Sequence, residues 1–136
     1  MNVKKAILIT IFFPLLLCCV DGEEILIEPS YSVEGKWLWS PSENRLDANT
    51  MYEFIDGVRY TYYCITCPAD DVYWSSLDIT DALPSSNAYT FENDTLKVDL
   101  HFGNELVALI TFECDGGKLF MDGGFSQLWR LNSDCN

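Results

Sequence analysis

Two cysteines, Cys64 and Cys67, have the Cys-x-x-Cys spacing that occurs in thiol redox proteins. A reactive thiol in such a motif usually lies at a helix N-terminus, whose positive end lowers the thiol pKa. Here the pair follows a run of β-forming residues and precedes Pro68, so we expect a structural disulfide. Together with Cys114 and Cys135 the pair could also form a four-thiolate zinc site, but an oxidising compartment disfavours that chemistry.

No other set of polar residues is arranged as in an enzyme. His101 is the only histidine, so no histidine cluster can bind a metal. The serines lack the flanking glycines of a hydrolase nucleophile motif. The acidic residues Asp70, Asp71, Asp78 and Asp81 could offer oxygens to calcium, but the ligand spacing and glycine of an EF-hand loop are absent. We therefore expect a protein without catalytic residues, metal or cofactor.

The most suggestive side chains are aromatic residues in the first half of the chain. On strands such residues usually fill a core, but a concave aromatic surface can also bind a small apolar molecule. If these residues bind a ligand, Tyr73 and Trp74 lie in a long loop at the entrance to the cavity. The candidate ligand-binding residues are Tyr52, Phe54, Tyr60, Tyr62, Tyr73 and Trp74.

The elements that must position these residues are short strands. Alternating or aromatic runs recur about every ten residues and are separated by turn signals, which is typical of an all-β meander. Asp56-Gly57, for example, is a strong hairpin signal because both residues tolerate a positive φ. The eight predicted strands are 36–40, 51–55, 58–64, 88–92, 95–102, 106–114, 118–121 and 125–131.

The order of these runs predicts how the strands close. Eight sequential antiparallel strands leave two exposed edges unless the sheet closes into a barrel. We therefore predict an all-β, eight-stranded antiparallel up-and-down barrel without an amphipathic helix. Residues 66–87 are the exception, since this segment is either a ninth strand or a lid.

The same strand order predicts the disulfides of an exported chain. With eight strands, the turns at 56–57, 93–94 and 115–117 share one end of the barrel, where Cys114 and Cys135 meet. Cys64 is then left to pair with Cys67. A ninth strand would bring all four cysteines to one end and allow Cys64 or Cys67 to pair with Cys135.

The N-terminus indicates export. Two lysines precede an uncharged apolar run of about fifteen residues, which is shorter than the roughly twenty of a membrane span. We expect a signal peptide over residues 1–22 and a linker over 23–34. Alternatively, Leu16-Leu17-Cys18-Cys19 resembles a bacterial lipobox, with cleavage before Cys19 and lipidation of that residue as a membrane anchor. The protein is then either an outer-membrane lipoprotein or a secreted protein.

The charge balance excludes one class of partner. The formal net charge is −13, and the few lysines and arginines are scattered along the chain. Because binding to a phosphate backbone depends on clustered cations, nucleic acid is not expected as a partner.

Short motifs at both ends of the strand series resemble those of lipocalins. Gly35-Lys36-Trp37 matches the Gly-x-Trp sequence that opens the lipocalin barrel. Trp129-Arg130-Leu131, on the last strand, offers the arginine that packs over this tryptophan in that family. The predicted domain, residues 35–136, is similar to short bacterial lipocalin-like domains, which are calycin-type barrels. The resemblance implies an apolar barrel interior, with Gly35, Trp37 and Arg130 as its structural motif.

Two functions are consistent with such a barrel. The first is an exported, non-enzymatic protein that binds a small apolar or aromatic ligand. The alternative is a solid-core interaction module of the cell envelope that binds a partner protein. An eight-stranded barrel either holds one small ligand or is filled by its own side chains. Large inward residues such as Phe54, Leu100 and Phe112 favour filling, whereas Ala108 favours a cavity.

Overall fold

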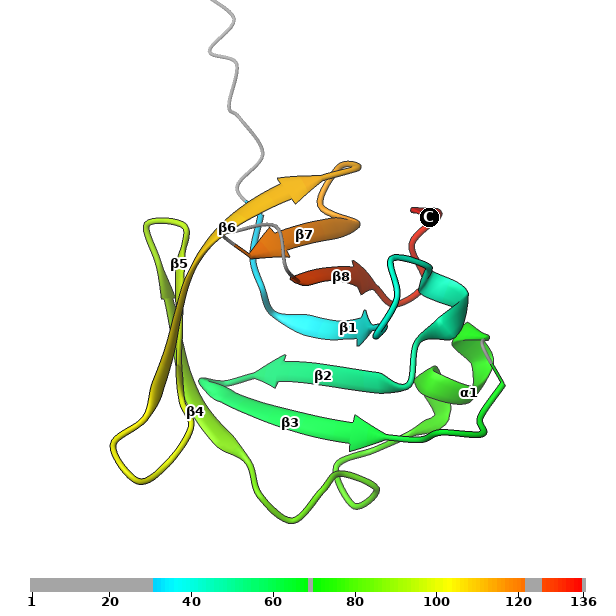
Figure 1. The fold of residues 1–136 in the computed structure, drawn as a ribbon, viewed down its shortest axis with the longest axis horizontal. Coiled ribbons are helices and arrows are strands. Elements are labelled where there is room, and N and C mark those ends of the chain that lie inside the picture. Colours follow the sequence, from blue (N-terminus) through cyan, green and yellow to red (C-terminus); the bar gives the residue numbers. More distant parts are fainter. Residues whose placement is uncertain (1–30, 69, 122–125, 136) are drawn as a thin grey trace, which may run out of the picture.

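Eight antiparallel strands form a closed barrel in the computed structural model, which describes residues 31–68, 70–121 and 126–135 (Figure 1). Each strand pairs with the next along the chain, and the last pairs with the first through Trp37–Arg130, Leu38–Trp129 and Trp39–Leu128. The predicted up-and-down barrel is therefore confirmed. The strands are β1 Gly35–Trp39, β2 Thr50–Ile55, β3 Val58–Tyr63, β4 Asn87–Glu92, β5 Thr95–Asp99, β6 Glu105–Glu113, β7 Lys118–Met121 and β8 Ser126–Arg130.

Tight turns join the strands at one end of the barrel. Asp56 and Gly57, between β2 and β3, have φ values of 50° and 77°, as the hairpin signal predicts. Asn93 and Asp94, between β4 and β5, likewise have positive φ. A positive φ at both central residues matches the twist of the turn to that of the strands. We call this the turn end, and the end that carries the β1–β2, β3–β4 and β5–β6 connections the open end.

The barrel interior is lined by every second residue of the strands. On β2, Tyr52 and Phe54 point inward, whereas Met51 points outward. Phe112 also packs against the interior, and Ala108 is buried there. This alternation follows from the two-residue period of a strand. The buried interior cluster consists of Val33, Trp37, Phe54, Tyr89, Leu96, Val98, Ala108, Ile110, Leu119 and Leu128.

The predicted strand over residues 95–102 is too long at its C-terminal end. β5 ends at Asp99, and Leu100, expected in the core, is 42% exposed, while Phe102 is fully exposed. The Asp99 carboxylate accepts a hydrogen bond of 2.7 Å from the His101 amide, and His101, Phe102 and Gly103 all have positive φ. This local turn removes the three residues from the alternating pattern.

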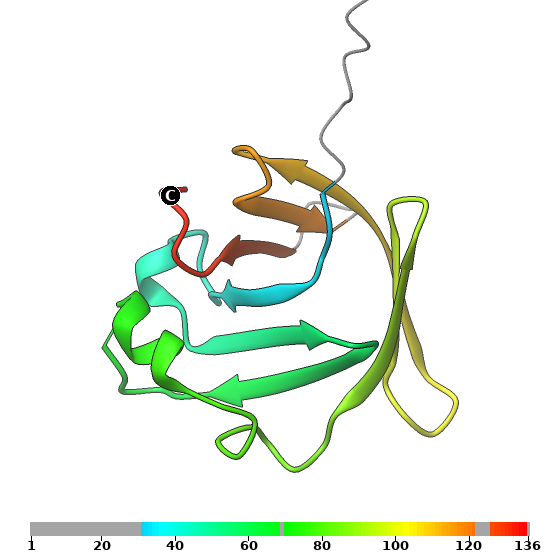
Figure 2. The same cartoon turned by 180° about the vertical axis from the view of Figure 1, so that it is seen from behind.

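Of the two alternatives for residues 66–87, the ninth strand is wrong, because residues 71–76 form a short helix. Helix α1 (Asp71–Ser76) begins where the Asp70 carboxylate accepts a hydrogen bond of 2.8 Å from the Tyr73 amide. Such a side chain satisfies an amide that lacks a partner within the helix. In both ribbon views α1 lies beside a 3-10 helix, η1 (Arg45–Asp47) (Figures 1 and 2). Arg45 and Asp71 join them by an ion pair of 2.6 Å.

Two disulfides connect the cysteines as the eight-strand order predicts. Cys64 is bonded to Cys67 after β3, and Cys114 is bonded to Cys135 at the turn end. Disulfides persist in oxidising compartments, so they indicate a non-cytoplasmic location.

The N-terminal predictions fall mostly outside the described residues. The signal peptide (1–22), Cys19 and residues 23–30 of the predicted linker belong to that part of the chain. At the other end of the predicted linker, Val33 is buried in the interior cluster, so this residue is part of the barrel. Within the described ranges, no helix has both the length and the apolar character needed to cross a bilayer.

Candidate ligand-binding site

Two adjoining cavities lead from the open end into the barrel. The inner cavity has a volume of about 150 Å³ and is enclosed mainly by apolar and aromatic side chains. Its lining consists of Trp39, Tyr52, Phe54, Arg59, Leu96, Leu106, Met121 and Ser126. The outer pocket has a volume of about 440 Å³ and is lined by Trp39, Ser40, Pro41, Ser42, Glu43, Phe120, Ser126 and Gln127. The two cavities share Trp39 and Ser126 as a common wall.

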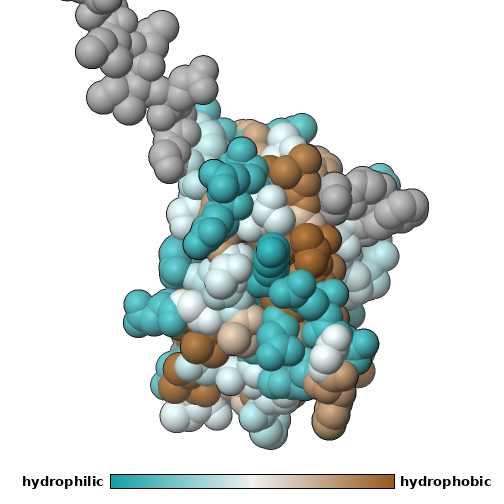
Figure 3. All heavy atoms as spheres, turned by 90° about the vertical axis from the view of Figure 1, so that its left-hand side faces the viewer, coloured by the Kyte–Doolittle hydropathy of each residue, from teal (hydrophilic) through white to brown (hydrophobic). Residues whose placement is uncertain are grey.

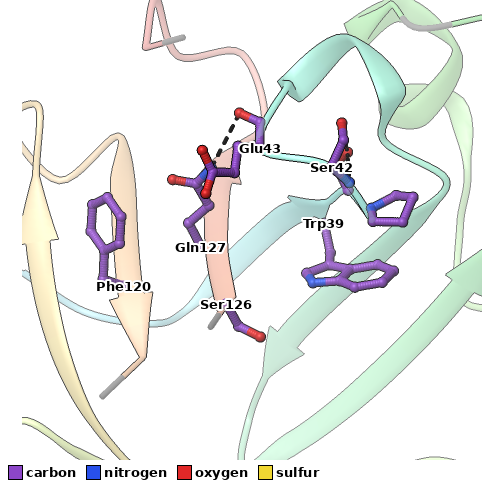
Figure 4. A pocket seen from close by; sticks show the side chains of 8 residues that line it. Trp39, Ser42, Glu43, Phe120, Ser126 and Gln127 are labelled. Atoms are coloured by element: carbon purple, nitrogen blue, oxygen red, sulfur yellow. Dashed lines mark hydrogen bonds between the residues drawn. The ribbon is translucent and has the colours of Figure 1, made fainter. Parts of the chain in front are cut away.

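The outer pocket is more polar than the inner cavity. Figure 4 shows Trp39 and Phe120 on opposite sides of it, with Ser126 between them. The side-chain amide of Gln127 donates a hydrogen bond of 3.2 Å to the backbone carbonyl of Glu43, which ties β8 to the β1–β2 connection (Figure 4). An elongated ligand can therefore place an apolar group inside the barrel and a polar group at its mouth.

Arg59 is the one charged side chain in the lining of the inner cavity. Its guanidinium carbon lies 5.0 Å from the centroid of the Tyr52 ring, within the range of a cation–π contact. Its Nη2 donates a hydrogen bond of 2.7 Å to the side-chain carbonyl of Asn87. Burial lowers the pKa of Arg59, and burial also raises the pKa of Tyr52, which the charge of Arg59 partly offsets.

The barrel wall divides the six aromatic residues predicted to bind a ligand. Tyr52 and Phe54 line the inner cavity. The other four lie outside the barrel, where α1 covers β1, β2 and β3. In this outer cluster, Tyr62 and Trp74 are buried with Leu38, Met51 and Leu131, and Tyr60 and Tyr73 pack against them.

Strand periodicity explains this division. Tyr60 and Tyr62 share one face of β3 and Arg59 lies on the other, so the two tyrosines point away from a cavity that Arg59 lines. The prediction missed Trp39, Arg59, Leu96, Leu106, Met121 and Ser126. A signal was available for Trp39, because it lies two residues after Trp37 and so shares its face. Nothing in the sequence spacing indicated that Arg59 lines the cavity.

Two tyrosines outside the inner cavity donate hydrogen bonds to carboxylates. The Tyr62 hydroxyl donates to Glu53, and the Tyr89 hydroxyl donates to Glu34. Burial and these bonds raise the pKa of both phenols above the ordinary value of 10.0. The protonated phenols therefore stabilise the fold below pH 10, and this contribution is lost as the pH rises above that value.

We expect the free energy of unfolding to fall as the pH is raised from about 9 to about 11, because unfolding lets both phenols ionise. The double variant Tyr62→Phe, Tyr89→Phe should show a smaller fall. Urea denaturation at a series of pH values measures it. Tyr63→Phe is the matched control, since it removes a phenol from an exposed position. An equal fall in the double variant and the unaltered protein would contradict the assignment.

The predicted structural motif, Gly35, Trp37 and Arg130, lies at the turn end. The guanidinium carbon of Arg130 is 4.4 Å from the centroid of the Trp37 ring. Its Nη1 and Nη2 donate hydrogen bonds to the carbonyls of Glu34 and Ser32, and its Nε donates to the carbonyl of Gly116. Gly35 has a φ of 110°, and a Cβ there would lie 3.3 Å from Nη1 of Arg130. Arg130 thus joins β8 to residues 32–34 and to the β6–β7 turn at this end.

The remaining candidate residues make local contacts. Asp78 accepts hydrogen bonds from Thr80, and Asp81 accepts one from the Asp78 amide. His101 lies in the β5–β6 turn, where a ring nitrogen is 3.0 Å from the carbonyl of Ser86. Across the ranges that the structure covers, no three His, Cys, Asp or Glu side chains are grouped so as to hold a metal ion.

Comparison of the chain with models of known protein families, with curated proteins and with solved structures finds no match.

Proposed function

We propose that this protein is an exported, non-enzymatic, lipocalin-like barrel that binds a small apolar or aromatic ligand at its open end. The inner cavity carries the proposal. It combines a concave shape, an aromatic and aliphatic lining and a few polar groups, which are the usual features of a small-molecule site.

The volume of the inner cavity limits the apolar part of the ligand to about one ring. A cavity on the order of 150 Å³ lined by apolar side chains is large enough to accept benzene. Larger ligands would extend past Trp39 and Ser126 into the outer pocket. The remaining interior is filled by the protein's own side chains, so the site is a small cavity inside the barrel that adjoins the outer pocket.

The lipocalin-like assignment and the export are supported by separate observations. Arg130 over Trp37, next to Gly35, is the contact that the resemblance implies. The disulfides are consistent with passage through an oxidising compartment. The uncharged run before Cys19 supports a signal peptide, with release after residue 22 or a lipid anchor at Cys19 as the two forms of the exported protein.

The test is native mass spectrometry of the protein, expressed as the full chain and recovered after export to an oxidising compartment. We expect a small organic adduct that dissociates on gentle activation, or one that forms during incubation with a library of lipids and aromatic compounds. Leu106→Trp should abolish the adduct because the larger side chain fills the cavity. Val107→Trp is the matched control, since the adjacent side chain is exposed on the outer wall. A chain that stays bare throughout would contradict ligand binding.

Exposed apolar side chains favour the second candidate, a solid-core module that binds a partner protein. Phe102 projects from the β5–β6 turn, and Val107 and Leu109 are about half exposed on β6. Figure 3 shows apolar patches on the side formed by β4, β5 and β6, separated by hydrophilic side chains. For this function, we expect mass spectrometry to detect the chain without any bound small molecule.

A further inference from the structure

The inner cavity contains a cation whose hydrogen bonds are incomplete. The Nε of Arg59 is buried and has no hydrogen-bond partner within the described part of the chain. No carboxylate in that part forms an ion pair with this guanidinium. The side chain as a whole is half-buried, and a charge that is partly removed from water usually has a counterion or a full set of hydrogen bonds, because its desolvation is costly. Arg59 therefore has unused capacity to bind an anion.

The surroundings of Arg59 hold the guanidinium in place. The Tyr52 ring lies against it, and Nη2 is bonded to the Asn87 carbonyl. The amide of Asn87 in turn donates a hydrogen bond of 2.7 Å to the backbone carbonyl of Asp99, which anchors it to β5. A guanidinium held on two sides loses little further freedom when it binds a ligand, so its remaining N–H groups are pre-organised.

A purely structural role accounts for only part of this arrangement. The Arg59–Asn87 bond joins β3 to β4, which are paired through only Val58–Ala88 and Arg59–Asn87. This role explains the bond made by Nη2. This structural role leaves Nε without a hydrogen-bond partner. It also gives no reason for a cation in the inner cavity, whose lining is otherwise largely apolar.

We infer that the ligand of the inner cavity is a small apolar carboxylate, such as a single-ring aromatic acid. This inference rests on the proposed function, because it names the chemical class of ligand for the same cavity. The carboxylate accepts hydrogen bonds from Arg59, and the ring packs among Phe54, Leu96, Leu106 and Met121. A guanidinium matches a carboxylate in both charge and planar geometry, whereas a neutral apolar ligand leaves the Arg59 charge without a counterion.

The acidic character of the whole protein does not oppose this local preference. The net charge of −13 is spread along the chain, and charges at the surface are screened over about 8–10 Å at ordinary ionic strength. Arg59 acts at contact distance inside a site partly shielded from water, where an opposite charge is screened much less. The one charged residue in the outer pocket lining is Glu43, and it does not line the inner cavity.

Isothermal titration calorimetry with benzoate and its neutral isostere nitrobenzene tests the inference on the exported full chain. We expect benzoate to bind at least about tenfold more tightly than nitrobenzene. Arg59→Gln should weaken benzoate binding by about 10- to 100-fold, the usual effect of losing a charge-assisted hydrogen bond, and should leave nitrobenzene binding nearly unchanged. Lys97→Gln is the matched control, because it removes an exposed positive charge from the outer wall of β5.

The outcomes separate this inference from the proposed function. Equal affinities for benzoate and nitrobenzene would overturn the carboxylate inference and retain the apolar site. Binding of neither compound, with a chain that stays bare in mass spectrometry, would overturn both. The comparison of the two compounds on the unaltered protein does not depend on how well Arg59→Gln folds. Arg59→Lys adds a second variant that keeps the charge, and it should restore part of the preference for benzoate.

Discussion

Replacing Trp37 by alanine is expected to lower the free energy of unfolding by about 3–5 kcal/mol, the usual cost of removing a large buried aromatic side chain. Trp37 is fully buried in the interior cluster. Its indole nitrogen donates a hydrogen bond of 2.7 Å to the carbonyl of Val33, and its ring supports the guanidinium of Arg130. The substitution removes apolar contacts, this hydrogen bond and a cation–π contact together.

Urea denaturation followed by far-ultraviolet circular dichroism measures the effect. Phe102→Ala is the matched control, because that side chain is fully exposed and its loss should change stability by less than about 0.5 kcal/mol. Trp37→Phe should lie between the two, since it keeps a ring but loses the N–H donor. A loss below about 1 kcal/mol for Trp37→Ala would show that the turn end is not organised around this residue.

Removing the Cys114–Cys135 disulfide by replacing both cysteines with alanine should cost about 3 kcal/mol. The bond closes a loop with a sequence separation of 21 and fastens the C-terminal segment to the turn between β6 and β7. A cross-link restricts the unfolded chain more when the loop it closes is longer. The Cys64–Cys67 bond, with a separation of 3, should contribute only about 1.5–2 kcal/mol on the same basis.

Denaturation of the two double-alanine variants under identical conditions compares these contributions. We expect the Cys114/Cys135 variant to be the less stable of the two. The reverse order would indicate that Cys64–Cys67 does more than close a short loop, for example by holding the segment that leads from β3 to α1. Neither disulfide lines the inner cavity, so a variant that remains folded should still bind ligand.

The site and the main stabilising contacts involve different residues. The lining of the inner cavity runs from Trp39 and Ser126 to Phe54 and Arg59, and it does not include Trp37, Arg130 or the Cys114–Cys135 bond. This separation lets the cavity keep an incompletely paired Arg59 while other contacts maintain the fold. Incomplete pairing of a polar group is common where a protein binds a ligand, because the ligand completes it.

Local patterns in the sequence were sufficient for most of the strands, for the hairpin turns and for the disulfides. Asp56-Gly57 predicts a hairpin because the conformation depends only on what these two residues tolerate. Strand order then predicts which cysteines meet, because each hairpin reverses the chain.

The strand prediction failed where one side chain competed with the alternating pattern. The Asp99 carboxylate accepts a hydrogen bond from the His101 amide, and β5 ends early at Asp99. The helix α1 was missed for a similar reason, since its start depends on a cap by Asp70 in a segment with mixed polarity.

The tertiary structure alone decided which aromatic residues share a site. The sequence places Tyr52, Tyr62 and Trp74 close together along the chain, but the barrel wall separates Tyr52 from the other two. The reason is geometric: a strand sends alternate side chains to opposite faces, and only closure of the sheet determines which face becomes an interior. The role of Arg59 depends on the same closure. It lies in a cavity whose lining comes from seven of the eight strands, so no pattern within one segment could identify it.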